Sequence, residues 1–349
     1  MGTSLAETVA GGERANPMNS TYAVFRMASA YWASQTIYVA AKLGIADVLG
    51  EGSKSGDEIA SATGANGNSL ARLTRALVGL GLLSVDGGGR FRLTGIGASL
   101  QSSRPGSMRS LILMLGEEHY QAWGKLIHSV KCDTPAFDQV FRRPLFEYLA
   151  ENAAAAQTFN EAMSDLTSLM ALATILAYDF SGSRVVADIG GGHGMLLDSI
   201  LRTNPATKGI LFDSEQVIAA AGRHIWNQGG GDRRQGVGGD FFESVPAGAD
   251  TYILKNVLHD WSDEQALRIL QNCRRAMDSH AKLLVIEMVL PLADDAVFGS
   301  LLDLNMLVMS GGRERTKDEY CSLLEKTGLH LTQVIPTLAP VSILEAMPV

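Results

Sequence analysis

The chain has 349 residues, of which 46 % are hydrophobic and 19 % are charged, and its formal net charge is −8. This length and composition are typical of a folded chain of about two domains, and they exclude a wholly disordered chain, a collagen and a coiled coil. The acidic balance disfavours a partner with a phosphate backbone, so we expect no nucleic-acid ligand.

The cysteines and the hydropathy pattern further limit the classes of protein to which the chain could belong. Cys132, Cys273 and Cys321 are far apart in the sequence, which indicates neither a disulfide framework nor a zinc site. We therefore expect a protein of the reducing cytoplasm. The sequence has no run of 18 apolar residues, so no membrane span is predicted. Residues 1–19 have no apolar core typical of a signal peptide, and we interpret them as a flexible tail.

The first folded segment is predicted to be helical over residues 20–50. Its apolar residues, among them Trp32, Ile37 and Leu43, recur at helical spacing. Such large apolar groups near the start of the chain need a partner surface. A buried core is one interpretation, and an interface between two copies of the chain is the other.

Residues 54–100 follow a pattern of helix, turn, helix and hairpin. A short helix opens at Ser55 and ends near Gly64, and a second begins at about Ser69, before a turn of three glycines at Gly87–Gly89. This order predicts a winged helix. Five basic and three acidic residues give the segment a net charge of only +2, which is no basic stripe. We therefore expect residues 20–105 to be a scaffold, and a DNA-binding regulator is the less favoured alternative.

The rest of the chain divides into a helical part, residues 106–180, and a part with alternating strands and helices, residues 181–349. Strands are expected over Arg184–Ile189, Lys208–Phe212, Thr251–Lys255 and Ala281–Val289. Strands separated by helical segments favour a parallel sheet with crossover helices, which is an α/β fold.

A glycine turn follows the first of these strands. Gly190 and Gly192 begin a G-x-G-x-G sequence in which Met195 replaces the last glycine of the dinucleotide fingerprint. Asp213 ends the next strand, 23 residues after Gly190. An acid at about this distance accepts hydrogen bonds from ribose hydroxyls. The pattern therefore predicts a nucleoside ligand, although a purely structural turn remains an alternative.

A third segment is suited to an adenine ring. Asp240 could accept a hydrogen bond from the exocyclic amine while Phe241 covers the face of the ring. A simple turn residue at Asp240 is the competing interpretation.

The sequence from Leu254 to Gln265 contains a histidine where ligands bind in open parallel sheets. A strand ends near Lys255, and Ser262 with Gln265 forms a capping box that starts the next helix, so His259 lies in the loop between them. Asp260 is adjacent to it. Glu287 interrupts an apolar strand and therefore needs a buried partner, and Glu314 is a second acid, in a turn before a helix.

These motifs together resemble the caffeate-type, S-adenosylmethionine-dependent small-molecule O-methyltransferases, including their bacterial natural-product branch. The resemblance rests on Val-Val-Ala-Asp-Ile-Gly-Gly-Gly-His-Gly, Phe-Asp and Gly-Gly-Asp-Phe-Phe, and it extends from about Tyr31 to the C-terminus. It implies a Rossmann-like class I methyltransferase domain with a mostly parallel sheet, and an N-terminal winged-helix domain that forms a homodimer. It also implies S-adenosylmethionine as cofactor and S-adenosylhomocysteine as product.

The resemblance further implies roles for individual residues. The catalytic group comprises a histidine flanked by two acids and a neighbouring aspartate, which correspond to His259, Glu287, Glu314 and Asp260. The residues expected to bind the cofactor are Asp188, Gly190, Gly192, Asp213, Asp240, Phe241 and Lys255. The residues expected to line the acceptor pocket are Phe159, Met163, Asp303, Asn305 and Met306.

The expected reaction is methylation of an aromatic hydroxyl of a small secondary metabolite, with His259 as general base and no metal ion. A phenol with a pKa near 10 and an imidazole near 6.5 differ enough that full proton transfer costs on the order of 5 kcal/mol. Nearby carboxylates must therefore stabilise the imidazole cation, mainly Glu287 in this interpretation, with Glu314 as a second acid. The alternatives are methylation of nitrogen and a reaction on the same scaffold that transfers no methyl group.

Overall fold

The computed structural model describes residues 17–224, 233–290 and 297–349, and the contacts within the chain divide it into two compact units. The first unit runs to Gly116 and the second from Glu117 to Val349. The expected tail, residues 1–19, lies mostly outside the described residues. None of the described helices has the length and hydropathy of a membrane span.

The first unit consists of short helices and one hairpin. Its helices are α1 (Pro17–Ala28), α2 (Tyr31–Lys42), α3 (Ile45–Leu49), α4 (Gly56–Thr63), α5 (Gly67–Gly79), α6 (Gly95–Ala98) and α7 (Arg109–Met114). Strands β1 (Leu83–Val85) and β2 (Phe91–Leu93) pair antiparallel. A π-helix, η1 (Leu115–His119), contains the boundary between the units.

Local sequence explains where these helices begin and end. The Ser55 hydroxyl accepts the N–H of Glu58 while the Glu58 carboxylate accepts the N–H of Ser55, so a capping box starts α4. The helix ends at Gly64, as predicted, and this glycine adopts the left-handed conformation. The predicted helix over residues 20–50 is interrupted, because Gly44 has φ +65° and separates α2 from α3.

The second unit begins with the helices α8 (Tyr120–Trp123), α9 (Leu126–Cys132), α10 (Ala136–Phe141), α11 (Leu145–Glu151) and α12 (Ala153–Ala177). The later helices are α13 (Met195–Thr203), α14 (Glu215–His224), η3 (Leu258–Asp260), α15 (Asp263–Ala276), α16 (Val297–Met309) and α17 (Lys317–Glu325). Apolar residues of α8, α10 and α11 pack with Val308 and Met309 of α16 in one cluster.

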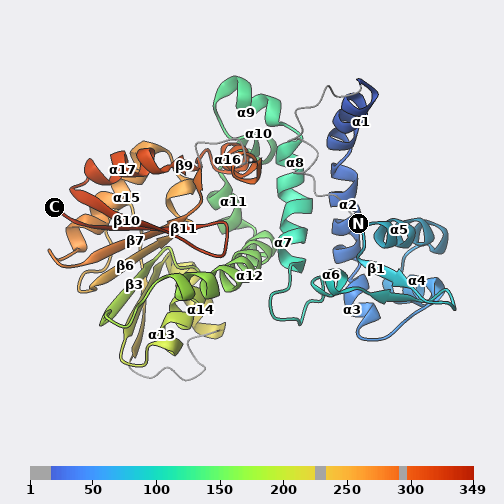
Figure 1. The fold of residues 1–349 in the computed structure, drawn as a ribbon, viewed down its shortest axis with the longest axis horizontal. Helices are drawn as coiled ribbons and strands as arrows, with labels where there is room; N and C mark the ends of the chain where they lie inside the picture. The colour runs from blue at the N-terminus through green and yellow to red at the C-terminus, as the bar shows by residue number, and fades with distance from the viewer. Residues whose placement is uncertain (1–16, 225–232, 291–296) are drawn as a thin grey trace. The chain divides into compact units, whose positions relative to one another are not determined.

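A seven-stranded sheet forms the centre of the second unit, with strand order β10-β11-β7-β6-β3-β4-β5 (Figure 1). Its strands are β3 (Val185–Ile189), β4 (Lys208–Asp213), β5 (Arg234–Gly238), β6 (Thr251–Lys255), β7 (Lys282–Glu287), β10 (Leu329–Pro336) and β11 (Ser342–Pro348). β7, β6, β3, β4 and β5 pair in parallel, and β11 is antiparallel to both neighbours. The short strands β8 (Val289–Leu290) and β9 (Arg315–Thr316) pair separately. The mostly parallel sheet confirms the predicted fold class.

Successive residues of a strand point to opposite faces of a sheet. Both faces of this sheet are apolar, and helices cover both. Ala187, Tyr252 and Leu283 join a buried cluster with residues of α15 and α17. The neighbouring Val186, Ile253 and Leu284 join a second cluster with residues of α12, α13 and α14. In Figure 1, α15 and α17 lie on one side of the sheet and α13 and α14 on the other.

Four predicted strands are present within one or two residues of their expected ends, but β5, β10 and β11 were not predicted. β5 reads Arg-Gln-Gly-Val-Gly and lies at the edge of the sheet, where little apolar surface is buried. Ile189, Asp213, Lys255 and Glu287 all lie at the carboxyl ends of neighbouring parallel strands. The sheet therefore brings the predicted motifs to one edge.

Candidate active site

The glycine turn after β3 packs tightly against the end of β4. The N–H of Gly190 donates to the Phe212 carbonyl at 2.8 Å, and the N–H of Gly192 donates to Asp213 Oδ2 at 2.9 Å. Gly190 and Gly192 have φ +69° and +59°, a region that favours glycine. A Cβ on Gly191 would lie 2.5 Å from Leu211 Cδ1 and 2.7 Å from the Asp188 carboxyl group. A side chain at Gly191 would therefore displace the turn or the side chains of Leu211 and Asp188.

Asp188 lies beneath this turn and is almost fully buried. Burial raises its pKa to about 7, although the positive charge of Lys255 opposes the shift. Burial also raises the pKa of Asp213, and the hydrogen bonds from Gly192 and Ser214 oppose that change. The negative charge of Asp213 also raises the pKa of Asp188, so these two carboxyl groups, both expected to bind the cofactor, influence each other electrostatically.

Helix α12 contacts the turn and the end of β6 through two hydroxyl groups. Lys255 Nζ donates to Thr167 Oγ1 at 3.0 Å, and Ser164 Oγ lies 3.2 Å from His193 Nδ1. Burial lowers the pKa of Lys255 to about 8, although Asp188 and Glu287 oppose the shift. Sequence reasoning did not identify Thr167 or Ser164, since a hydroxyl inside a helix carries no local signal of such a contact.

Asp240 and Phe241 lie on the turn after β5. Asp240 is exposed, and its Oδ1 accepts the N–H of Phe242 at 2.8 Å. Asp240 therefore holds the turn, as its competing interpretation expects, and its exposed carboxylate remains accessible to a ligand. A Cβ on Gly190 would lie 3.7 Å from Phe241 Cε1, so the Phe241 ring adjoins the glycine turn.

His259 is buried in η3 and contacts Glu314. Its Nδ1 lies 2.7 Å from Glu314 Oε1, and both side chains are at most one-tenth exposed. Among the described residues, Nε2 of the ring has no hydrogen-bond partner. Burial alone would lower the pKa of the imidazole, but the negative charges of Asp260, Glu314 and Glu287 outweigh it and raise that pKa to about 9.

Glu287 holds the backbone of this loop and makes no hydrogen bond to the imidazole. Its Oε1 accepts the N–H groups of Val257, Leu258 and His259 at 3.0, 2.6 and 3.4 Å. Its Oε2 accepts the hydroxyl of the buried Tyr320. The sequence led us to expect that Glu287, with Glu314 as a second acid, stabilises the imidazole cation. In the structure Glu314 makes the direct contact with the ring, while Glu287 raises the pKa of His259 through its charge and holds the backbone of the loop.

Asp260 completes the acidic surroundings of His259. Burial raises its pKa to about 6, the positive charge on His259 opposes the shift, and Glu287 and Glu314 add to it. Asp303 on α16 accepts the N–H of Glu314 at 2.9 Å through Oδ1. This predicted pocket residue is therefore connected to the residue that contacts the imidazole.

The other predicted pocket residues lie on α12 and α16. Phe159 and Met163 are half-buried and four residues apart, so they share one face of α12 with Thr167. Asn305 accepts the indole N–H of Trp123 at 2.9 Å, and Met306 is buried. This face of α12 contacts two parts of the site: Phe159 contacts Phe146, which stacks on Trp261, and Thr167 accepts the hydrogen bond from Lys255.

Aromatic rings extend from Phe159 to the turn after β5. Phe146 contacts Phe159 edge-on at 6.4 Å and stacks on Trp261 at 5.4 Å between centroids. Trp261 in turn contacts Phe242 and Phe241 at 4.7 and 6.0 Å. Sequence reasoning missed Phe146, which lies 115 positions before Trp261 and reaches it only through the tertiary fold.

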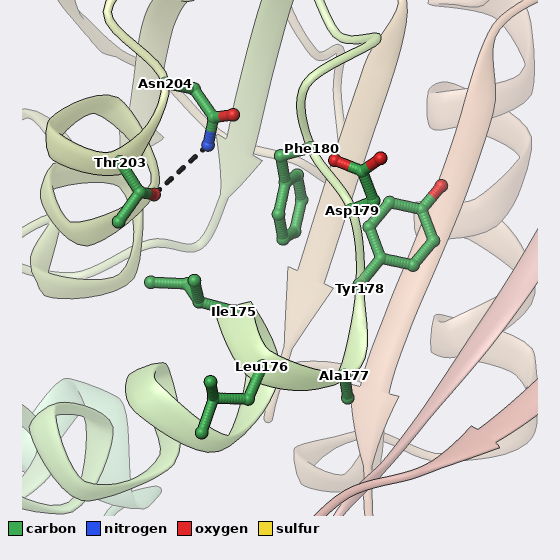
Figure 2. A pocket seen from close by; sticks show the side chains of 8 residues that line it. All are labelled: Ile175, Leu176, Ala177, Tyr178, Asp179, Phe180, Thr203 and Asn204. Atoms are coloured by element: carbon green, nitrogen blue, oxygen red, sulfur yellow. Dashed lines mark hydrogen bonds between the residues drawn. The ribbon is translucent and has the colours of Figure 1, made fainter.

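A pocket of about 360 Å³ lies elsewhere, between the end of α12 and the end of α13 (Figure 2). Its lining residues are Ile175, Leu176, Ala177, Tyr178, Asp179, Phe180, Thr203 and Asn204. These segments precede β3 and β4, so the pocket lies at the amino ends of the strands. It is therefore separate from the edge that carries His259.

The described residues include no group of three or more acidic, histidine or cysteine side chains suited to a metal ion.

Comparisons with known proteins show the family of the chain. The O-methyltransferase domain family matches residues 123–330, and the O-methyltransferase dimerisation domain matches residues 25–103. The phenazine O-methyltransferase PhzM of Lysobacter antibioticus is 44 % identical over 96 % of this chain and 98 % of its own length.

Two further similar proteins have names or titles that print other small molecules. The 8-amino-8-demethylriboflavin N,N-dimethyltransferase of Streptomyces davaonensis is 34 % identical over 86 % of this chain and 87 % of its own. The O-methyltransferase NcsB1 from neocarzinostatin biosynthesis was solved with S-adenosylmethionine and 2-hydroxy-5-methyl naphthoic acid. It is 34 % identical, has a TM-score of 0.79, and the match covers 91 % of this chain and 96 % of that chain.

Proposed function

The chain belongs to the family of S-adenosylmethionine-dependent O-methyltransferases, and we propose that it methylates a hydroxyl group of a small aromatic secondary metabolite with His259 as general base. The observation that carries the proposal is the contact between His259 and Glu314. The carboxylate lies 2.7 Å from Nδ1, which leaves Nε2 available to an acceptor hydroxyl.

The surroundings of His259 suit removal of a phenolic proton. With the imidazole pKa at about 9 and a phenol near 10, full transfer costs on the order of 1 kcal/mol, compared with the order of 5 kcal/mol for an ordinary imidazole. The same raised pKa leaves only a small neutral fraction at neutral pH. Glu314 and Asp260 thus make the imidazole a stronger base and move its working range to higher pH.

The glycine turn fits S-adenosylmethionine. The absence of side chains at Gly190 and Gly191 keeps the turn closely packed on Phe212 and Asp188, and Asp213 lies at the adjoining strand end. We assign Asp213 to the ribose hydroxyls, Asp240 and Phe241 to the adenine, and Asp188, Gly190, Gly192 and Lys255 to the rest of the site. When bound, S-adenosylmethionine supplies a methyl group that its sulfonium makes electrophilic.

The aromatic rings beside His259 suit a flat acceptor. Phe146, Trp261 and Phe159 present apolar faces and edges next to the catalytic loop, and rings favour offset-stacked or edge-to-face contacts with other rings. We assign Phe159, Met163, Asp303, Asn305 and Met306 to the acceptor pocket. His259 Nε2 would accept the proton of the acceptor hydroxyl while a carbon–oxygen bond replaces the methyl–sulfur bond, so that S-adenosylhomocysteine would leave as the product.

We assign the first unit to a homodimer interface. Residues 25–103 match a dimerisation domain, and α1 and α2 expose large apolar side chains. Phe25, Tyr31 and Trp32 are each more than half exposed. A second copy of the chain would cover these rings, as the early apolar residues of the sequence suggested.

The relatives differ in the atom that accepts the methyl group, because some are named O-methyltransferases and some N-methyltransferases. The acceptor atom is therefore the part of the proposal to test first. A matched test incubates the enzyme and S-adenosylmethionine with pairs of phenols and anilines on the same phenyl, naphthyl and phenazine rings. Mass spectrometry reads the products. We expect methylation of the hydroxyl member of a pair, and methylation of the amine alone would overturn the proposal.

A further inference from the structure

Arg315 is a buried charge next to the catalytic loop. Its side chain is fully buried, and it makes five hydrogen bonds. Nη1 donates to the Leu258 carbonyl at 2.8 Å, and Nη2 donates to the Trp261 carbonyl at 2.9 Å. Nε and Nη2 both contact Asp263 Oδ1, at 3.0 and 2.9 Å. These carbonyl groups flank the pair of residues His259 and Asp260.

The catalytic loop is therefore held from two sides by opposite charges. Glu287 accepts N–H groups at the start of the loop, and Arg315 donates to carbonyl groups on both sides of His259. Neither side chain forms a hydrogen bond with the imidazole among the described residues. Both act on the backbone that carries it.

The segment that contains Arg315 also carries Glu314. The N–H of Arg313 donates to the His259 carbonyl at 2.8 Å, and the Gly312 backbone packs so closely on His259 and Asp260 that a Cβ would collide with the His259 carbonyl. Arg315 holds the loop that carries His259, and it directly follows Glu314 in the chain. Its side chain therefore links the backbone of the histidine to the backbone of its carboxylate partner. A loosened guanidinium would release the histidine and its carboxylate partner from each other.

We propose that Arg315 is a positioning residue for methyl transfer, whose guanidinium holds the Leu258 and Trp261 carbonyl groups so that His259 stays against Glu314. This inference rests on the proposed role of His259. Arginine suits the task because its planar fork reaches four acceptor atoms in fixed directions, whereas an ammonium group is a compact charge that cannot span them.

The test compares Arg315→Lys with wild type and with Arg274→Lys as a matched control. Arg274 also donates to a backbone carbonyl, that of Gly328 at 3.1 Å, but it lies away from the loop. For Arg315→Lys we expect kcat to fall by roughly 10²-fold, with the Kd for S-adenosylhomocysteine unchanged. The ascending limb of kcat/KM should also move to lower pH, because the imidazole loses its close carboxylate partner. Arg274→Lys should match wild type in all three.

A second variant keeps the proposal testable if Arg315→Lys does not fold. Asp263 is half-exposed and holds two of the guanidinium donors, so Asp263→Ala should fold and shift kcat and the pH profile in the same direction by a smaller amount. Wild-type kcat and pH profile in a folded Arg315→Lys would overturn the proposal. Unfolding of Arg315→Lys together with a wild-type profile in Asp263→Ala would also overturn it, in favour of a purely structural role.

The variant His259→Ala separates this inference from the proposed function. A large loss of kcat in His259→Ala with wild-type kcat in Arg315→Lys contradicts only the role of Arg315. Retained kcat in His259→Ala contradicts the proposed base itself.

Discussion

Glu287 and Leu258 are joined by a 2.6 Å hydrogen bond from the Leu258 N–H to Glu287 Oε1. The acid at the end of β7 thus supports the backbone at the end of β6, and its carboxylate stays buried with every oxygen paired. This contact gives Glu287 a structural task that the sequence alone did not indicate. It also makes Glu287 and Glu314 experimentally distinguishable.

Glu287→Ala should destabilise the protein and slow methyl transfer together. The substitution leaves buried N–H groups of Val257 and Leu258 without an acceptor, which costs about 3 kcal/mol in the free energy of unfolding. Urea unfolding measures this value. The matched variant Tyr320→Phe removes only the contact with Oε2 and should cost about 2 kcal/mol, because a hydrogen bond to a charged group contributes about 1.5–3 kcal/mol. Equal unfolding free energies for Glu287→Ala and wild type would show that the loop does not depend on Glu287.

Glu314→Gln should shift the pH dependence of the reaction. The carboxylate of Glu314 is one of the charges that raise the pKa of His259 to about 9, so kcat/KM of wild type should increase with pH up to about that value. Removing the charge lowers the pKa of the imidazole, and the ascending limb should move to lower pH. The plateau should fall because the neutral amide stabilises the imidazole cation less. Identical ascending limbs of kcat/KM in Glu314→Gln and wild type would show that Glu314 does not influence the pKa that governs the reaction.

Gly191→Ala should abolish binding of S-adenosylhomocysteine. The added methyl group would lie 2.5 Å from Leu211 Cδ1 and 2.7 Å from the Asp188 carboxyl group, so the turn or these two buried side chains must shift. Gly182→Ala is the control, because a Cβ there meets no atom within 4 Å. Isothermal titration calorimetry measures both. Binding within threefold of wild type in Gly191→Ala would mean that the ligand does not depend on this turn.

Asp213→Ala should weaken cofactor binding by at least roughly 10-fold, since charge-assisted hydrogen bonds contribute about 1.5–3 kcal/mol. The side chain also accepts the N–H groups of Gly192 and Ser214, so part of the loss arises from the turn. Titration of adenosine and of its 2′,3′-dideoxy form into wild type and variant separates the two causes. If Asp213 accepts the ribose hydroxyls, adenosine should lose more affinity in the variant than the dideoxy form, and the loss that both share measures the effect on the turn.

Local patterns in the sequence predicted much of the fold and the composition of the site. The capping box of Ser262 and Gln265 correctly placed the start of α15, and the strand ends correctly placed the glycine turn and His259 at one edge of the sheet. These features depend on neighbouring residues, so they can be read without the tertiary structure.

The contacts between the acids and the loop could not be predicted in the same way. Whether Glu287 reaches the imidazole or the backbone depends on the register of β6 and β7, in which Lys255 pairs with Ile286. Tyr320 and Arg315 carry no local signal of their partners, since Tyr320 matches the apolar face of α17 and Arg315 reads as an ordinary charged residue. Only the assembled fold brings them to the loop.

The most direct test of the central claim measures kcat of His259→Ala and wild type on one aromatic hydroxyl acceptor at saturating S-adenosylmethionine, with calorimetric titration of S-adenosylhomocysteine into both. General base catalysis contributes roughly 10²–10⁴ in rate, so we expect kcat to fall by that factor while the Kd stays unchanged. A kcat within threefold of wild type at unchanged Kd would contradict the claim that His259 removes the acceptor proton.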